Sequence, residues 1–313
     1  MSDVVQSVRR LKSLKSTARV AMTAAPRVFA SADIAARLLT HLDDPQFARL
    51  WARAQPHTLL DMFRAKQILD HARAALELPG DFIECGVADG GISLLLACLL
   101  EEMKSDKRVF VCDSFQGLPT PDRRVDKDYA AGEFAVSADR VRAMLNREGV
   151  LDRCVIVEGW FEDTLPNLAP ELRLAFAHID CDLYHPALTC LKHLSPRLQA
   201  GAPMVFDDYL DGSEGIFRAV NGHVAVTGEQ VRLGPTCQAT VIQGERPQPD
   251  AYTLMLNETG QVDPSGFTLH ISLADLQANG TYKAYLGIVR DDLVDRADDI
   301  TAQLAVLDEP TSS

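Results

Sequence analysis

Three aspartates that follow two short apolar segments could together bind a metal ion. Asp180 ends the segment Leu174–Asp180, and Asp207 and Asp208 follow the next segment. If both segments are neighbouring parallel strands, about 4.8 Å apart, the three carboxylates converge and repel one another unless a cation lies among them. Carboxylate oxygens suit Mg²⁺ or Ca²⁺. The alternative is that one of the paired aspartates caps the next segment and that the cluster binds no metal.

A glycine-rich turn after an earlier apolar segment could bind a nucleoside. Glu84 lies near the end of that segment, Gly86 follows it, and Asp89 and Gly90 precede a helical stretch. Glycines let a ligand approach the backbone closely, but their spacing does not match the dinucleotide fingerprint G-x-G-x-x-G. The two acidic residues suit an ammonium or sulfonium group better than a phosphate. An ordinary tight turn is the alternative.

Two later strand ends could complete such a nucleoside site. Asp113 is 23 residues after Gly90, near the position at which an acidic residue binds ribose hydroxyls in nucleotide-binding sheets. Gly159 and Trp160 follow the next segment and could place an aromatic ring against adenine. Together these features describe a nucleoside that carries positive charge, and S-adenosylmethionine fits. The alternatives are that Asp113 caps a helix and that Trp160 packs in the core.

The elements that must position these residues alternate between short apolar segments and helical stretches. This alternation predicts an α/β fold with a doubly wound, mostly parallel sheet. Such sheets bind ligands at the carboxyl ends of their strands, which is where the acidic residues occur. The predicted strands are Asp81–Cys85, Arg108–Cys112, Cys154–Glu158, Leu174–Asp180 and Pro203–Asp207, and the predicted helices are Gly91–Met103, Ala138–Glu148 and His185–Leu198.

The chain divides into three regions by pattern. The pattern of residues 1–80 predicts helices, because apolar residues recur there at helical spacing between prolines. Residues 81–245 hold the sheet, and residues 246–313 predict a small β-rich extension. Because three strands form a marginal domain, we expect the extension to pack on the main body or on a second chain. The strands expected in it are Tyr252–Leu256, Phe267–Ile271 and Tyr282–Val289.

Composition excludes several classes of protein. The 313 residues are 47% hydrophobic and 24% charged, which is typical of a globular chain rather than a disordered one. The net charge of −13 argues against nucleic acid as a partner. The longest apolar run, Ile92–Leu100, is short of the roughly 20 residues of a transmembrane helix, and no secretory signal is evident. Seven scattered cysteines fit a reducing compartment, so we expect a cytoplasmic protein.

The ordered motifs resemble those of the macrocin and mycinamicin O-methyltransferase family. The resemblance covers roughly residues 55–245. It rests on Glu84-Cys-Gly-Val with Gly90-Gly91, Asp113-Ser-Phe-Gln-Gly-Leu-Pro119, Gly159-Trp-Phe-Glu-Asp-Thr-Leu-Pro166, Ile179-Asp-Cys-Asp-Leu-Tyr184 and Val205-Phe-Asp-Asp-Tyr209. Two positions depart from the family pattern: Cys181 replaces a common glycine, and Ala88-Asp89 replaces a large aromatic and a basic residue.

The resemblance implies a Rossmann-like class I methyltransferase sheet and an enzyme that uses S-adenosylmethionine and Mg²⁺ to methylate sugar hydroxyls. It also implies a homo-oligomer whose N-terminal helices shape the acceptor pocket. Carried over to this chain, it places Glu84 and Gly86 at the methionine end of the cofactor. Asp113 would bind the ribose, with Ser114 beside it. Asp180, Asp207 and Asp208 would bind the metal.

Methyl transfer to a hydroxyl needs a base, and two residues are candidates. Asp180 ranks first because it ends a strand beside the expected metal, and His185 follows at the start of a helix. His178, two residues before Asp180, is interpreted as a core histidine.

Three other functions remain alternatives. One is a catechol-type O-methyltransferase acting on a planar phenol. Another is a nicotinamide-dependent oxidoreductase, which the missing fingerprint disfavours. The third is a non-catalytic protein that binds a glycan or a partner on the same fold, which the intact acidic residues disfavour. The acceptor itself is not identified by the sequence.

Overall fold

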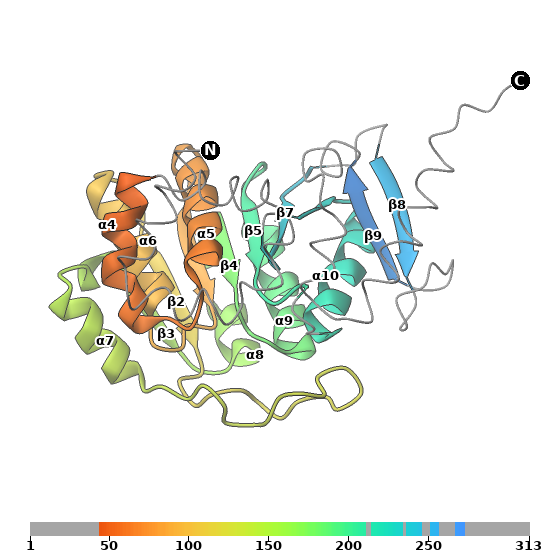
Figure 1. Ribbon diagram of the computed structural model, residues 1–313, viewed down its shortest axis with the longest axis horizontal. Coiled ribbons are helices and arrows are strands. Elements are labelled where there is room, and N and C mark those ends of the chain that lie inside the picture. Colours follow the sequence, from red (N-terminus) through yellow and green to blue (C-terminus); the bar gives the residue numbers. More distant parts are fainter. Residues whose placement is uncertain (1–43, 211–213, 234–235, 246–250, 257–266, 273–313) are drawn as a thin grey trace, which may run out of the picture.

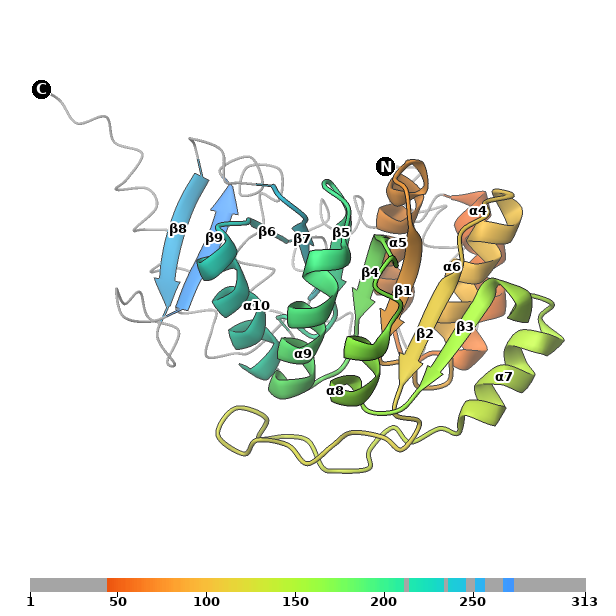
Figure 2. The same cartoon turned by 180° about the vertical axis from the view of Figure 1, so that it is seen from behind.

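The structure is a computed structural model that describes residues 44–210, 214–233, 236–245, 251–256 and 267–272 (Figure 1). A seven-stranded sheet with helices on both faces forms its centre, so the predicted α/β fold is confirmed (Figures 1 and 2). Its strand order is β3-β2-β1-β4-β5-β7-β6. The strands are β1 (Asp81–Cys85), β2 (Val109–Asp113), β3 (Cys154–Glu158), β4 (Leu174–Ile179), β5 (Pro203–Phe206), β6 (Val231–Leu233) and β7 (Ala239–Ile242).

The strand order places a topological switch point between β1 and β4. The chain runs outward from β1 through β2 to β3, and then returns to β4 on the other side of β1. The first five strands are parallel, and β7 runs antiparallel to both of its neighbours. Ligands bind outside the carboxyl ends of the strands at such a point. The five predicted strands are confirmed to within about a residue.

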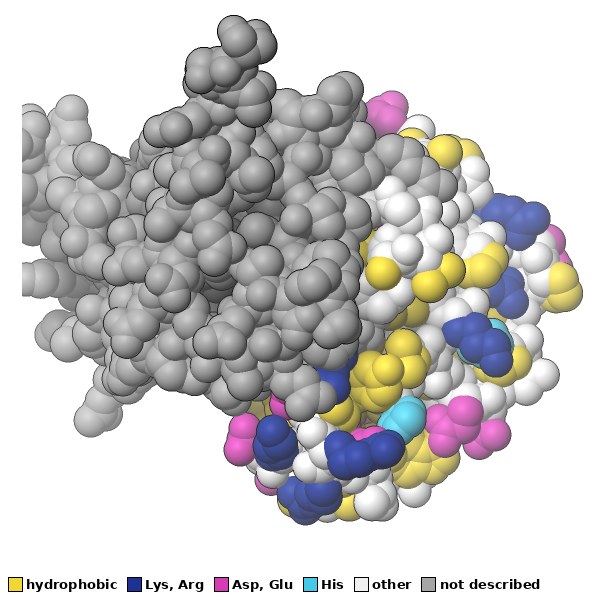
Figure 3. Space-filling view, turned by 90° about the vertical axis from the view of Figure 1, so that its right-hand side faces the viewer, with side chains coloured by type: hydrophobic (Ala, Val, Ile, Leu, Met, Phe, Trp, Pro, Cys, Tyr) yellow, Lys and Arg dark blue, Asp and Glu magenta, His cyan; other side chains and the backbone are white. Residues whose placement is uncertain are grey.

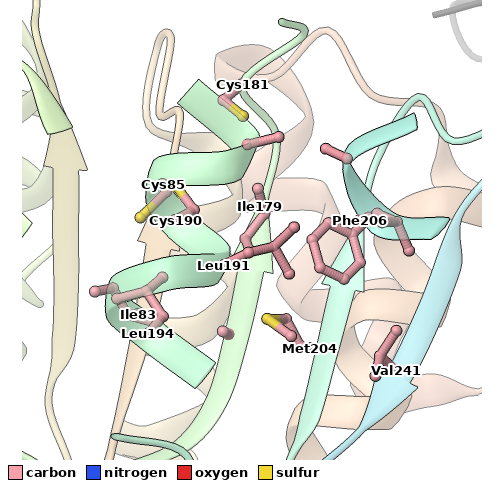
Figure 4. Packing of buried hydrophobic residues seen from close by; sticks show 14 of the residues in the cluster. Ile83, Cys85, Ile179, Cys181, Cys190, Leu191, Leu194, Met204, Phe206 and Val241 are labelled. Atoms are coloured by element: carbon pink, nitrogen blue, oxygen red, sulfur yellow. The ribbon is translucent and has the colours of Figure 1, made fainter. Parts of the chain in front are cut away.

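Helices cover both faces of the sheet because strand residues alternate between two apolar clusters. On one face lie α4 (Pro45–Ala54), α5 (Met62–Ala74), α6 (Gly91–Glu102) and α7 (Ala138–Arg147), and on the other lie α8 (Phe161–Thr164), α9 (Tyr184–Leu194) and α10 (Glu214–Thr227). Phe82 of β1 faces the first cluster and Ile83 the second. Figure 4 shows that Leu191 and Leu194 of α9 pack against the strands of the second cluster.

The cap of α5 is the feature of the N-terminal region that matters for the site. The Asp61 carboxylate accepts hydrogen bonds from the backbone N–H groups of Phe63 (2.8 Å) and Arg64 (3.0 Å), which stabilises the first turn. This turn carries Arg64 to the carboxyl edge of the sheet. The prediction of N-terminal helices is confirmed for α4 and α5, and residues 1–43 lie outside the described residues.

Two further strands follow the sheet, β8 (Ala251–Leu256) and β9 (Phe267–Ser272), and they pair antiparallel. They match two of the three strands expected in the C-terminal region, and the third, at 282–289, lies outside the described residues. β9 packs beside α10 and β6, so this pair lies on the main body (Figure 1). The domain boundaries themselves stay predictions.

The described surface and helices add two observations. In the face shown in Figure 3, basic, acidic and apolar side chains of the described residues are interspersed. Among the described residues, no helix has both the length and the apolar character needed to cross a bilayer.

Candidate active site

A cavity of about 340 Å³ lies at the carboxyl edge of the sheet, at the switch point. Its size is within the range of small-molecule sites, about 300–1,000 Å³. Eight of the twelve residues predicted for the site line it, and four do not. Those that line it are Glu84, Gly86, Asp113, Ser114, Trp160, Asp180, Asp207 and Asp208, and those that do not are Asp89, Gly90, Gly159 and His185.

Gly86 joins the end of β1 to the end of β4. Its backbone is left-handed, with a φ of +89°, and a Cβ atom added there would lie 1.6 Å from the Asp180 carbonyl oxygen. The Asp180 N–H in turn donates to the Cys85 carbonyl oxygen over 2.8 Å. Glycine is therefore required here by a close backbone approach, which sets the position of Asp180 relative to the turn.

The Asp113 carboxylate connects the ends of β1 and β2. It accepts hydrogen bonds from the N–H groups of Val87 and Phe115, each over 2.7 Å. In the described chain no helix begins between Asp113 and Ala138, so the helix-cap alternative for Asp113 is wrong. Ser114 beside it accepts from the Gln116 N–H, and the two turns are thereby held at the mouth of the cavity.

Glu84 is buried on the face of β1 that packs against α6. The Ser93 hydroxyl of α6 donates to its carboxylate, and His178 Nδ1 lies 3.2 Å from the other oxygen. The β1–β4 register pairs Glu84 with His178 directly. His178 is buried, as expected of a core histidine, but its contact with Glu84 was missed by the sequence analysis, although the register between neighbouring parallel strands could have indicated it.

Asp89 and Gly90 contact α7 instead of the cavity. Asp89 forms an ion pair with Arg140 at 2.8 Å, and a Cβ atom on Gly90 would lie 2.9 Å from Val141. Asp89 therefore links this turn to α7, and Gly90 allows the turn to approach that helix closely.

Gly159 and His185 also lie outside the cavity lining. A Cβ atom on Gly159 would lie 2.8 Å from the Thr164 side chain, so this glycine allows the chain to turn into α8. The side chain of His185 is 65% exposed, and its Nε2 lies 3.5 Å from Asp122.

Asp180, Asp207 and Asp208 converge as the sequence predicts. Each offers a carboxylate oxygen, and these oxygens lie within 4.8 Å of one another. Burial, together with the charges of Asp207 and Asp182, raises the pKa of the Asp180 carboxyl well above its ordinary value. The Gln238 side-chain amide donates to Asp207 Oδ1 over 2.5 Å and orients this carboxylate.

The sequence analysis missed the cation that lies against this cluster. Arg64 Nη1 is 2.5 Å from Asp207 Oδ2 and 3.4 Å from Asp208 Oδ1. Burial alone would lower the pKa of Arg64, but the neighbouring carboxylates raise it well above its ordinary value. No local signal could reveal this contact, because Arg64 and Asp207 are 143 positions apart.

The cluster fits a divalent cation by its donor chemistry. Mg²⁺ and Ca²⁺ bind oxygen at about 2.0–2.6 Å, so oxygens within 4.8 Å of one another can share one ion. Burial is the largest cause of the raised pKa of Asp180; the charges of Asp207 and Asp182 raise it further, and Arg64 opposes them.

The long segment between β2 and α7 covers the cavity and was also missed as a site element. Tyr129 and Phe134 of this segment line the cavity, as does Leu59 before α5. The Asp126 carboxylate holds the segment by accepting from the Tyr184 N–H at the start of α9 over 3.1 Å. The phenol and phenyl rings give this side of the cavity an aromatic wall.

The fold is that of a class I methyltransferase. The model of the macrocin O-methyltransferase (TylF) family matches residues 33–228, and the chain belongs to this family. The resemblance found in the motifs is thereby confirmed, and the protein is an enzyme of the methyltransferase class, which sets aside the oxidoreductase and non-catalytic alternatives.

Two curated relatives illustrate the similarity. The 8-demethyl-8-(2,3-dimethoxy-alpha-L-rhamnosyl)-tetracenomycin-C 4'-O-methyltransferase of Streptomyces olivaceus is 37% identical over 179 residues, covering 51% of this chain and 67% of that protein. Mycinamicin III 3''-O-methyltransferase of Micromonospora griseorubida is 34% identical over 166 residues, covering 49% of this chain and 65% of that protein. The chain thus spans about two thirds of the length of these relatives.

Two solved structures share the fold. The O-methyltransferase NovP is 28% identical with a TM-score of 0.53, covering 60% of this chain and 82% of that one. The calicheamicin methyltransferase CalS11 is 24% identical with a TM-score of 0.52, covering 68% and 92%.

Proposed function

We propose that this protein transfers a methyl group from S-adenosylmethionine to a hydroxyl of a sugar or glycosylated natural product, with Mg²⁺ as the second cofactor. One observation carries the proposal. A single cavity brings the acidic ends of β1 and β2 together with the aspartates at the ends of β4 and β5. The named acceptors of the curated relatives, which are glycosylated or sugar-bearing, support the class of acceptor. A cytoplasmic location and a homo-oligomeric state stay predictions.

The β1–β2 half of the cavity has the groups that the cofactor requires. S-adenosylmethionine, when bound, supplies a methyl group on a sulfonium centre. Glu84 would hold the positively charged methionine end, which Gly86 lets approach the backbone. Asp113, with Ser114 beside it, would accept hydrogen bonds from the ribose, and Trp160 would pack against adenine. The roles of Asp89, Gly90 and Gly159 would be indirect, through the turns that they shape.

The β4–β5 half has the groups for the acceptor. Mg²⁺, when bound by Asp180, Asp207 and Asp208, acidifies a coordinated hydroxyl. Asp180 would take the proton, because its carboxylate lines the cavity beside the oxygens of Asp207 and Asp208. His185 stays the second candidate, and its exposed position outside the cavity lining favours Asp180.

The test is methyl transfer from radiolabelled S-adenosylmethionine to glycosides that carry adjacent hydroxyls. We expect excess chelator to abolish turnover and Mg²⁺ to restore it. Asp207→Asn should lower kcat/KM by at least about 100-fold, whereas Asp152→Asn, on the exposed surface, should leave it unchanged. Full turnover in excess chelator contradicts the metal-dependent reaction.

A planar phenol is the second candidate acceptor. The aromatic wall formed by Tyr129 and Phe134 favours it, because aromatic rings stack on one another. Catechol and a rhamnoside offered at equal concentration distinguish the two: methylation of the catechol alone would replace the sugar as the acceptor class.

A further inference from the structure

The guanidinium of Arg64 contacts two of the three carboxylates that could hold a metal ion, those of Asp207 and Asp208. Its Nη1 contacts one oxygen of each carboxylate, at 2.5 Å and 3.4 Å. Asp207 is only 1% exposed, and the Arg64 side chain is 20% exposed, so water screens this pair weakly. A divalent cation within about 2.6 Å of the same oxygens would come close to Nη1, and two positive charges would then face each other.

We infer that Arg64 is the counter-cation of the aspartate cluster in the metal-free enzyme, which a divalent cation must displace, so that Arg64 lowers the metal affinity of the site. This inference rests on the metal site in the proposed function. In the metal-free protein, the positive charge of Arg64 stabilises these two nearly buried carboxylates.

Two contacts allow the Arg64 guanidinium to move away from the cluster while the aspartate side chains keep their orientation. First, Arg64 lines the cavity, and its Nε lies 3.4 Å from Asp61, so a carboxylate outside the cluster can hold its charge. Second, Gln238 donates to the oxygen of Asp207 that does not contact Arg64. Asp207 therefore keeps a partner that fixes its orientation when the guanidinium is displaced.

The opposite role for Arg64 would be to organise the aspartates for the metal. The direction in which the metal affinity changes when Arg64 is replaced distinguishes the two roles. If Arg64 competes with the metal, replacing it raises the metal affinity. If it organises the aspartates, replacing it lowers that affinity. A unit charge this close to a divalent ion changes binding by more than an order of magnitude at an effective dielectric constant of about 20.

The experiment compares the full chain with Arg64→Met, Arg64→Lys and the control Arg73→Met. Arg73 lies on the same helix and pairs with carboxylates at similar exposure, 24% against 20%, but away from the cluster. Each protein is freed of metal and titrated with Mn²⁺, with free Mn²⁺ followed by electron paramagnetic resonance. We expect Arg64→Met to lower the Kd for Mn²⁺ by at least about tenfold, Arg64→Lys to lower it less, and Arg73→Met to match the original chain.

A thermal readout accompanies the titration. Arg64→Met should have a lower Tm than the original chain without metal, and a larger rise in Tm on addition of Mg²⁺. An equal or a weaker Mn²⁺ affinity of Arg64→Met overturns the inference and leaves the metal site in place. Absence of binding in every protein, with turnover unaffected by chelator, overturns the metal in the proposed function and this inference with it.

A second measurement follows the original chain itself and uses a variant only to assign one resonance. In the original chain labelled with [¹⁵N]arginine, the Nε–H resonance of Arg64 is assigned by its absence from Arg64→Lys. We expect Mg²⁺ to shift this resonance and to leave that of Arg73 in place. An unmoved Arg64 resonance at saturating Mg²⁺ overturns the inference.

Discussion

A Cβ atom on Gly86 would lie 1.6 Å from the carbonyl oxygen of Asp180, so the backbones of these two residues are in direct contact. Gly86 belongs to the turn proposed to hold the cofactor, and Asp180 to the cluster proposed to hold the metal. The contact therefore fixes the distance between the two halves of the cavity. Methyl transfer depends on such positioning, because small displacements of the reacting groups cost large factors in rate.

Gly86→Ala should destabilise the protein far more than alanine at another left-handed glycine. Gly201 is the matched control: its φ is +83°, and a Cβ atom there would meet nothing within 4 Å. Gly201→Ala should lower the free energy of unfolding by about 1 kcal/mol through its backbone conformation alone, and Gly86→Ala by more than about 3 kcal/mol. Urea unfolding measures both. Equal losses would mean that the backbones can move apart.

Glu84→Gln should weaken cofactor binding while leaving the fold intact. Glutamine keeps the shape of this buried side chain but removes the charge that would hold the ammonium or sulfonium group. A charge-assisted hydrogen bond contributes about 1.5–3 kcal/mol, so the Kd for S-adenosylmethionine should rise by about tenfold or more. Calorimetry measures it, with the partly exposed Glu102→Gln on α6 as the control. Unchanged affinity would remove Glu84 from the cofactor site.

Trp160 should report cofactor binding by fluorescence. The chain has two tryptophans, and Trp51 is buried among α4 and its neighbours while Trp160 lines the cavity. In Trp51→Phe, the emission comes from Trp160 alone, and S-adenosylhomocysteine should quench it by stacking. In Trp160→Phe, which keeps only Trp51, the emission should not change. Equal quenching in both variants would place the adenine elsewhere.

His71 should make the protein less stable as the pH falls. Burial lowers the pKa of His71 to about 4, and its Nε2 lies 3.0 Å from the Thr240 hydroxyl of β7. Between pH 6.5 and about 4 the unfolded chain binds the proton and the folded one does not, so stability decreases with falling pH. The contribution is fully present above pH 6.5, and its loss should reach about 3 kcal/mol. Urea unfolding from pH 7 to pH 4 should show a smaller decrease in His71→Gln. Identical slopes would assign the acid sensitivity to other groups.

Much of the fold could be predicted from local sequence patterns. The five short apolar runs between residues 81 and 207 became parallel strands, because strands covered by helices on both faces of a sheet leave a continuous hydrophobic signature. The acidic residues after these runs, such as Asp113 and Asp180, lie at one edge because parallel strands all end there. The domain boundaries and the roles of the site residues stay predictions.

The directions and partners of individual side chains depended on the tertiary structure. Asp89 looked like a cofactor residue, yet it pairs with Arg140 of a helix that packs nearby. His178 was expected in the core, and the register of two strands set it against Glu84.

The class of fold, the edge of the sheet that carries the candidate site and the family of the chain all follow from the sequence, because they depend on the periodicity of apolar residues and on contiguous motifs. The contact of Arg64 with Asp207 and that of Gly86 with Asp180 became evident from the three-dimensional arrangement alone. The physical reason is that short segments encode their own backbone conformation, whereas contacts between distant residues depend on how strand order and helix packing bring them together.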